Sequence, residues 1–308
     1  MADFFDLAIA WEWEYDRDFV CSIDRECQKN MLSSYLIYPA NLNETLNLQA
    51  EGKIAFRMLF DRASDTNPKF HDIIHFAKRF PFKMVNEVSL LPRAVDKATM
   101  HLEFISNGIN VPYTIILSPW QKNQEIYTMM KLSDFKKLGM PFIIKPAHGG
   151  GGVGVVIDAR TIQEVVKARM EIAHDKYLLQ EKIVPVFLGK DLSRKAWFRV
   201  FYVCGEIIPC WWNNETFIYN MITSDEVKKY DFSELHDITK KIADICGLDF
   251  FSTEIVKVKD GRFIVVDYVN DMCDMRRKSR YPDGVPDEVV GKVIKRLVRY
   301  VKENAKKD

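Results

Sequence analysis

Strand-length apolar runs alternate with amphipathic segments over the first ninety residues. The apolar runs predict strands and the amphipathic segments predict helices, with strands at 4–11, 35–39 and 54–60 and helices at 17–30, 41–52 and 68–80. Strands that alternate with helices in this way are typical of an α/β layer with a parallel sheet. We therefore expect a first α/β domain over residues 1–92.

A more strand-rich pattern follows. It predicts a helix at 93–112 that stops at Gly108, a strand at 113–117, a helix and a strand on either side of Gly139, a helix at 160–173 and a strand at 177–184. Further on it predicts long strands at 196–212, a helix at 233–247, a hairpin at 250–269 that turns at Asp260–Gly261 and a last helix at 287–302. Glycine often ends helices, and Asp-Gly is a common hairpin turn. We expect two more units, residues 93–183 and 184–308.

Composition narrows the class of protein. The chain has 308 residues, 47% of them hydrophobic, and a net charge of +1. A charge so close to zero gives no overall attraction to nucleic acid or to an anionic membrane, and the longest apolar runs are too short to span one. The six cysteines form no CxxC pair, and the N-terminus lacks the basic start of a signal peptide. We expect a cytoplasmic protein with reduced thiols.

One segment, "IIKPAHGGGGVGVVID" at residues 143–158, contains four consecutive glycines. Phosphate is the usual reason for so much open backbone. A Walker loop would need Gly-Lys-Ser/Thr opening a helix, and a dinucleotide fingerprint would also need a helix after the loop. Here an apolar strand follows. The pattern predicts a strand–glycine loop–strand hairpin that can fold over phosphates, although a hairpin without a ligand remains the alternative.

Charged residues near this hairpin favour the phosphate interpretation. Lys145 lies inside the apolar strand "FIIKPA", where a lysine is costly unless it is paired or reaches an anion. Lys97 begins a predicted helix. Glu254 and Asp267 lie on the last pair of predicted strands, at facing positions.

The order of these parts resembles the ATP-grasp superfamily, the fold of D-alanine–D-alanine ligase, glutathione synthetase and biotin carboxylase. The matching pieces are "DKATMHLEFISNGINVP", "GMPFIIKPAHGGGGVGV", "YLLQEKI", "FRVFYVCGEII" and "GLDFFSTEIVKVKDGRFIVVDYVN". They span about 95–270 in the family's order. The resemblance implies an α/β and α+β architecture, in which an ATP-grasp fold follows an N-terminal α/β domain.

The resemblance also implies roles for particular residues. It assigns contacts with ATP to Lys97, Lys145, Gly150, Gly151, Gly152, Gln180, Glu181, Lys182, Ile183 and Asp191. Lys97 and Lys145 would neutralise phosphate charge, the glycines would cover the phosphates, the "QEKI" segment would contact adenine, and Asp191 would hold the ribose. Arg199, with Lys145, would act in catalysis by stabilising the transferring phosphoryl group. Simpler alternatives are a surface lysine at position 97, a surface carboxylate at 181 and a stacked structural arginine at 199.

The metal site departs from the family pattern. The family holds two Mg²⁺ (or Mn²⁺) ions with an acidic residue on one strand and Glu-x-Asn on the next. Glu254 suits the first position, but Asp267 and Asn270 are three residues apart. A regular strand would point them to opposite faces. A β-bulge could realign them, or Asp271 could join the site.

Four other features have a structural and a functional interpretation. "HDIIH" at 71–75 has a zinc-like spacing, but an exposed helix is the simpler interpretation. "MRRKSR" at 275–280 is either a solvated basic run or a site for an anionic substrate. His148 could touch phosphate or stay solvated in its loop. The segment Trp211–Asn214 could line a substrate pocket, or its tryptophans could belong to the core.

The function implied is an ATP-dependent ligase. A substrate carboxylate would attack the γ-phosphate to give an acyl phosphate, and an amine or thiol would then displace phosphate. A small-molecule kinase on the same fold, or a nucleotide-binding module without turnover, remains as an alternative. The expected partners are small-molecule carboxylate and amine substrates and a second copy of the chain, with neither nucleic acid nor membrane.

Overall fold

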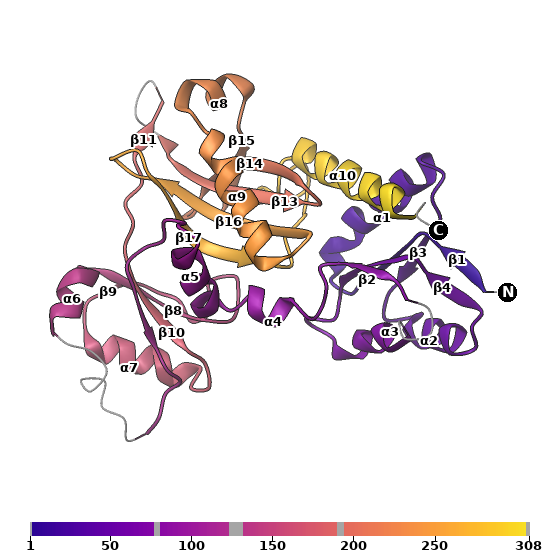
Figure 1. Ribbon diagram of the computed structural model, residues 1–308, viewed down its shortest axis with the longest axis horizontal. Helices are drawn as coiled ribbons and strands as arrows, with labels where there is room; N and C mark the ends of the chain where they lie inside the picture. Colours follow the sequence, from indigo (N-terminus) through magenta and orange to yellow (C-terminus); the bar gives the residue numbers. More distant parts are fainter. Residues whose placement is uncertain (1, 77–80, 123–131, 190–193, 306–308) are drawn as a thin grey trace.

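The computed structural model describes residues 2–76, 81–122, 132–189 and 194–305, and the fold is given for these ranges. The described residues form three main sheets, two of four strands and one of five. In Figure 1 the parallel sheet of the N-terminal part lies on the right, a large antiparallel sheet at the upper left and a smaller one at the lower left. None of the described helices is both long and apolar enough to cross a membrane.

The N-terminal part is the expected parallel α/β layer. Its sheet has the order β3-β2-β5-β6, made of β2 (Leu7–Trp11), β3 (Ser34–Ile37), β5 (Met58–Arg62) and β6 (Lys83–Val85). The connecting helical segments are η1 (Glu14–Asp16), α1 (Arg17–Lys29), α2 (Leu42–Ala50), η2 (Pro68–His71) and α3 (Asp72–His75). The predicted helix at 68–80 corresponds to η2 followed by α3, and its residues 77–80 lie outside the described ranges.

Two of the predicted strands are in fact divided. Residues 4–11 form β1 (Asp3–Phe5) and β2, and residues 54–60 form β4 (Ile54–Phe56) and β5. The breaks fall at Asp6 and Arg57, which form an ion pair of 3.0 Å. Asp6 also accepts hydrogen bonds from Ser33. The single charged residue inside each apolar run therefore marks the bend, and β1 and β4 form a separate two-stranded sheet.

The small antiparallel sheet has the order β7-β10-β8-β9. It consists of β7 (Thr114–Leu117), β8 (Phe142–Pro146), β9 (Val156–Ala159) and β10 (Tyr177–Glu181). Helices α6 (Leu132–Leu138) and α7 (Ile162–Glu171) pack on it through one apolar cluster. The glycine segment joins β8 to β9, so the predicted strand–loop–strand hairpin is present.

The large antiparallel sheet has the order β15-β14-β13-β16-β17. It consists of β13 (Trp197–Val203), β14 (Glu206–Asn213), β15 (Ile218–Met221), β16 (Phe250–Lys257) and β17 (Phe263–Asn270). A two-stranded ribbon, β11 (Phe187–Leu188) and β12 (Arg194–Lys195), precedes it, and α8 (Ser224–Tyr230) follows β15. Asp260 and Gly261 turn the β16–β17 hairpin as expected.

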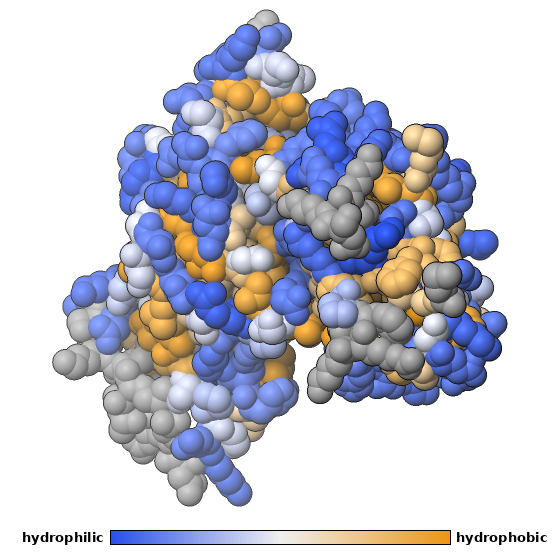
Figure 2. All heavy atoms as spheres, turned by 45° about the vertical axis from the view of Figure 1, so that its right-hand side comes forward, coloured by the Kyte–Doolittle hydropathy of each residue, from blue (hydrophilic) through white to orange (hydrophobic). Residues whose placement is uncertain are grey.

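Helices cover both faces of the large sheet. On one face, α5 (Lys97–Ser106) and α9 (Ser233–Cys246) share an apolar cluster with the strands, and the short α4 (Leu91–Ala94) leads into α5. On the other, α10 (Asp287–Ala305) packs beside α1, so the last helix is buried against the N-terminal part (Figure 1). On the surface drawn in Figure 2, hydrophilic residues predominate and hydrophobic ones gather in separate patches.

Candidate functional site

A row of charged side chains crosses three neighbouring strands of the large sheet. Arg199 on β13 lies opposite Glu254 on β16, and Glu254 lies opposite Asp267 on β17. Residues paired across antiparallel strands project from the same face. Arg199 Nη2 donates to Glu254 Oε1 at 2.7 Å, and Trp197 Nε1 donates to Glu254 Oε2 at 2.9 Å. We call Arg199, Glu254 and Asp267 the charged row.

A β-bulge brings Asn270 to the same place. Ser252 pairs with Asn270 and Glu254 with Asp267, so a two-residue step on β16 faces a three-residue step on β17. The extra residue bends the strand and redirects its side chains. The Asn270 amide donates to Ser252 O at 3.3 Å, and its side chain lies close enough to Asp267 to help lower the pKa of that carboxylate. The three-residue spacing thus does not separate Asp267 from Asn270.

Two lysines from outside the large sheet reach the charged row. Lys145 on β8 is 7% exposed and donates from Nζ to Val266 O at 2.9 Å. Lys97, the first residue of α5, donates from Nζ to Gly149 O at 2.6 Å. Its backbone N–H also bonds to Ala147 O at 2.9 Å, so the start of α5 is fixed against the end of β8.

These charges shift one another's pKa values. Burial, with the nearby charge of Lys97, lowers the pKa of Lys145 to about 8 against the opposing effect of Asp267 and Glu254. Burial raises the pKa of Glu254, although Arg199 opposes it. Burial acts in the same direction on Asp267, but Lys145, Lys97 and Arg199 outweigh it and hold its pKa below the ordinary value. Asp267 therefore gives up its proton more readily than Glu254 does.

The row offers oxygen ligands suited to Mg²⁺ or Mn²⁺. The donors are the carboxylates of Glu254 and Asp267 and the amide oxygen of Asn270. Within the described ranges, no group of three or more His, Cys, Asp or Glu side chains could hold a metal ion. Magnesium is commonly held by one or two carboxylates together with substrate phosphates. The donor set fits a metal that arrives with phosphate rather than one held in a closed protein cage.

The glycine loop leaves its backbone open beside Lys97. A Cβ built at Gly149, Gly150, Gly151 or Gly152 would meet no atom within 4 Å. Gly152 has φ of 78°, in the left-handed region that glycine adopts without strain. The loop therefore has room for a ligand against its backbone amides. Residues with a side chain would occupy part of this room and would be strained at positive φ.

The residues predicted to contact adenine are engaged within the protein. Gln180 is buried and donates to Tyr268 and Thr114. The Glu181 carboxylate accepts from the Tyr113 N–H at 2.8 Å. Lys182 pairs with Asp158. Ile183 follows the end of β10, and Asp191 lies outside the described residues. The side chains of Gln180 and Glu181 thus shape this end of the small sheet from inside it.

Three other sequence candidates have structural partners. His148 is held by Asp175, which accepts from the His148 N–H at 2.8 Å and contacts its Nδ1 at 2.8 Å. His75 Nδ1 lies 3.4 Å from Asp72 on the same exposed turn. Asp271 accepts from Asn86 Nδ2 at 2.6 Å, so its carboxylate joins the large sheet to the N-terminal part.

The basic run after β17 is also paired. Arg276 bonds to Asp274 and Asp283, and the next three cations contact other parts of the chain: Arg277 with Asp287, Lys278 with Tyr219 O, Arg280 with Asp18. These partners support the structural interpretation of residues 275–280. Trp211 and Trp212 belong to the two apolar clusters on opposite faces of the large sheet, and Trp212 also stacks 5.0 Å from the Arg199 guanidinium.

Sequence reasoning missed several residues that surround the site. Trp197 bonds to Glu254, Tyr219 lies 3.4 Å from Arg199 Nη1, and Tyr268 lies 5.1 Å from Lys145 Nζ. Trp197 lies two positions from Arg199 on one strand, so alternation alone could have placed both on one face. The other two contacts arise from pairing between distant segments and left no signal in the local sequence.

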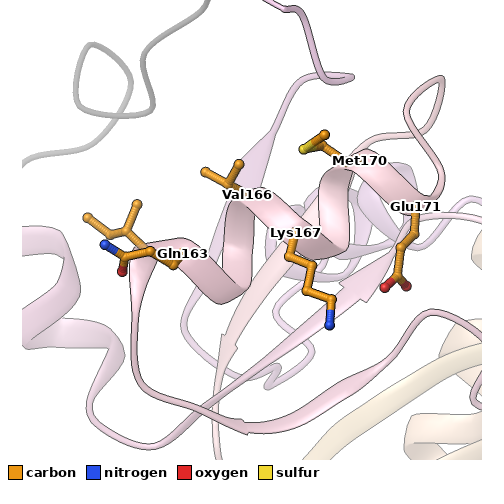
Figure 3. A pocket seen from close by; sticks show the side chains of 6 residues that line it. Gln163, Val166, Lys167, Met170 and Glu171 are labelled. Carbon is orange, nitrogen blue, oxygen red and sulfur yellow. The ribbon is translucent and has the colours of Figure 1, made fainter.

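A hollow of about 570 Å³ lies elsewhere, on the outer side of α7. Its lining side chains come from that helix alone: Ile162, Gln163, Val166, Lys167, Met170 and Glu171 (Figure 3). None of them belongs to the charged row, and the hollow is an open surface of one helix. We do not include it in the candidate site.

Comparison with known proteins identifies this arrangement. Residues 94–283 match the family model described as "RimK-like ATP-grasp domain". Among curated proteins, no sequence matches the chain. The fold, however, recurs in solved structures over nearly the whole chain.

Three of these structures illustrate the likeness. A RimK domain ATP-grasp protein from Sphaerobacter thermophilus DSM 20745 is 16% identical, with 96% of this chain and 99% of that chain covered and a TM-score of 0.64. D-alanine–D-alanine ligase from Bacillus anthracis, complexed with ATP, is 14% identical, with 99% and 97% covered and a TM-score of 0.62. ATP-grasp ligase PsnB, complexed with minimal precursor, Mg and ADP, is 13% identical, with 96% and 98% covered and a TM-score of 0.62. At such identities the likeness concerns the fold.

Proposed function

The chain belongs to the RimK-like ATP-grasp family, and from this premise we propose that it is an ATP-dependent, ADP-forming ligase that joins a carboxylate to an amine or thiol. The observation that supports this most directly is the charged row itself. Arg199, Glu254 and Asp267 lie side by side on one face, with Lys145 on Val266 next to Asp267. Phosphoryl transfer needs such cations and metal ligands around one phosphate chain.

The cations and the glycine loop would hold the nucleotide. Lys97 and Lys145 lie where the small sheet meets the large one, so phosphates bound there would replace their present contacts with Gly149 O and Val266 O. The open amides of the glycine loop would cover the same phosphates. The backbone of Lys182 and Ile183 would contact the adenine. The side chains of Gln180 and Glu181, through their bonds within the protein, would hold this segment in position. Asp191 stays a prediction for the ribose.

Glu254, Asp267 and Asn270 would hold Mg²⁺ or Mn²⁺. The metal, when bound, would neutralise phosphate charge and orient the γ-phosphate. The Bacillus anthracis ligase is complexed with ATP, and PsnB with Mg and ADP, which supports the same pair of ligands for this chain. The low pKa of Asp267 keeps one ligand anionic at neutral pH.

Arg199 would act on the reacting groups. A substrate carboxylate oxygen attacks the γ-phosphorus, the bond to the β-phosphate oxygen breaks, and ADP leaves. The amine nitrogen or thiol sulfur then attacks the acyl carbon, phosphate leaves with the electron pair of the bond that joined it to the acyl carbon, and the proton of the amine or thiol passes to water. The Arg199 guanidinium, held by Glu254 and stacked on Trp212, would stabilise the negative charge of the transferring phosphoryl group.

The substrates are proposed only as classes. Solved structures of this fold include D-cycloserine synthetase DcsG and PsnB with precursor peptide PsnA2, so both small molecules and peptides are to be tried. The cysteines in the described residues are all free, which supports a reducing compartment and our expectation of the cytoplasm. A second copy of the chain stays an expected partner.

The proposal is tested by product formation. Purified protein with ATP and Mg²⁺ is offered acids alone, amines or thiols alone, and mixed pairs, and ADP, phosphate and any acyl product are measured. We expect ADP only where an acid and an acceptor are both present. A protein that binds ATP and forms no ADP with any pair contradicts the proposal. A stable phosphorylated product without an acceptor would indicate a kinase instead.

A further inference from the structure

A buried chain of polar groups lies next to Lys145. Tyr268, on β17 beside Asp267, is fully buried. Its hydroxyl lies 2.6 Å from His101 Nδ1 on α5 and 2.8 Å from Gln180 Nε2 on β10. Gln180 Nε2 also donates to Thr114 Oγ1 on β7 at 3.0 Å. The Tyr268 hydroxyl therefore connects β17 of the large sheet to α5 and to β10 of the small sheet, and Gln180 extends the connection to β7.

The direction of these hydrogen bonds follows from the donors available. Gln180 Nε2 is a donor, so the Tyr268 oxygen accepts there. The buried phenol hydrogen gains an acceptor when it points to His101 Nδ1, and in that arrangement His101 is neutral with Nδ1 unprotonated. Burial, together with the charge of Lys145, lowers the pKa of His101 to about 4. The chain Gln180 to Tyr268 to His101 is thus complete in a single arrangement.

The ring of Tyr268 faces the lysine. Lys145 Nζ lies 5.1 Å from the ring centroid, within the distance of a cation–π contact. The same nitrogen donates to Val266 O, so both contacts come from β17. A lysine side chain is long and flexible, and a buried ring beside its ammonium group limits the positions that it can take.

We propose that Tyr268 is a positioning residue that directs the Lys145 ammonium toward the phosphates, and that His101 and Gln180 keep its ring in place. The inference rests on the proposed function, in which Lys145 binds phosphate. It gives Gln180 a role different from adenine contact, because Gln180 acts through Tyr268. It also links the adenine end of the site, which begins just after Gln180, to its phosphate end.

The test compares affinities for a phosphate-bearing and a phosphate-free ligand. Binding of MgATP and of adenosine is measured by calorimetry and ligand-observed NMR for the full chain and for Tyr268→Leu. We expect MgATP affinity to fall about tenfold, from the lost cation–π contact, and adenosine affinity to stay unchanged. Tyr268→Phe, which keeps the ring, should retain most of the MgATP affinity. A general structural defect would weaken both ligands.

Tyr177→Leu, which also removes a buried tyrosine ring, is the matched control. Tyr177 is also fully buried in a strand and donates its hydroxyl to Ala168 O at 2.6 Å, but its ring lies in the apolar cluster under α7. We expect it to lower stability without changing the ratio of MgATP to adenosine affinity. If Tyr268→Leu does not fold, His101→Leu and His101→Gln replace it. The first should weaken MgATP binding, and the second, which keeps an acceptor, should restore it.

Lys145→Ala separates this inference from the proposed function. If the wild-type chain fails to bind MgATP, the proposed function is wrong. If the wild-type chain binds and Lys145→Ala weakens binding, but Tyr268→Leu binds as the wild type does, the positioning role is wrong. Equal losses for MgATP and adenosine in Tyr268→Leu would also overturn it.

Discussion

At the scale of single residues, two neighbouring carboxylates of the site have pKa values that their surroundings shift in opposite directions. Glu254 is enclosed by Trp197 and Arg199, and burial raises its pKa. Asp267 lies one strand further, where Lys145 and other cations keep its pKa low in spite of burial. The pKa values of two acids in one row are therefore shifted in opposite directions, a pattern that is common in functional sites. We infer that Asp267 contributes most of the attraction for a metal.

Asp267→Asn should reduce the magnesium dependence of ATP binding. The change removes the anionic ligand and preserves shape, so MgATP affinity should fall at least about tenfold while affinity in excess EDTA stays near the wild-type value. Calorimetry with and without Mg²⁺ measures both. Asp260→Asn, at the exposed turn of the same hairpin, is the control. Equal magnesium dependence in Asp267→Asn and wild type would remove Asp267 from the metal site.

His101 should make stability depend on pH. Its folded-state pKa is about 4 against an ordinary value of 6.5, so between these values the unfolded chain binds a proton that the folded chain does not. The free energy of unfolding then falls as pH decreases from about 6.5 to 4, by up to about 3 kcal/mol. Urea unfolding at several pH values measures this slope. His101→Gln should have a smaller slope, and an unchanged slope would contradict the buried neutral histidine.

At the scale of elements, the glycine hairpin and the bulged strand carry the site. Both depart from regular structure where the chemistry is expected. The bulge lets Asp267 and Asn270 meet, and the positive φ angles of the loop expose amides beside Lys97. Irregular backbone is often found at such positions.

Gly152→Ala should weaken nucleotide binding more than it weakens the fold. An alanine at φ of 78° is strained by about 1 kcal/mol, and the loop relieves this strain by leaving its phosphate-covering shape. Gly139→Ala is a close control, since Gly139 has the same φ of 78° and equally open surroundings, but lies in the turn before β8. Both variants should lose similar thermal stability, and only Gly152→Ala should lose MgATP affinity. Equal MgATP affinities would mean that the loop does not cover the phosphates.

At the scale of the whole molecule, a buried arginine that is ion-paired within the N-terminal part also reaches the segment after β17. Arg62 bonds to Asp16 through two contacts of 2.7 and 2.8 Å and donates to Cys273 O at 3.0 Å, three residues after β17. Both side chains are 2% exposed. Together with the bond between Asn86 and Asp271, this pair sets how the N-terminal sheet meets the site.

Asp16→Asn should destabilise the folded chain strongly. It leaves the Arg62 charge buried without its counter-ion, which costs about 3–5 kcal/mol. Asp244→Asn, which breaks an exposed pair with Lys240, should cost under about 0.5 kcal/mol. Urea unfolding of the two variants measures the difference. Similar losses would show that the buried pair does not hold the parts together.

The sequence predicted local elements well and long-range contacts poorly. Periodicity or residue type marks the parallel layer, the glycine hairpin and the turn at Gly261. The strand breaks at Asp6 and Arg57 are each marked by a single charged residue inside an apolar run. The bulge could be anticipated only because a regular strand would misdirect Asn270. The partners of Arg276 and Gln180 depend on segments brought together by folding, which no local pattern encodes. The division into domains at residues 92 and 183 stays a prediction.

Titration calorimetry of the wild-type chain with ATP, in magnesium buffer and in EDTA, tests the central claim most directly. The charged row, the two lysines and the glycine loop predict saturable binding at one site per chain, tighter with Mg²⁺ and weakened by Lys145→Ala. If no binding heat is detected with ATP in either buffer, and ATP displaces no other bound nucleotide, the claim is contradicted, whatever the fold resembles.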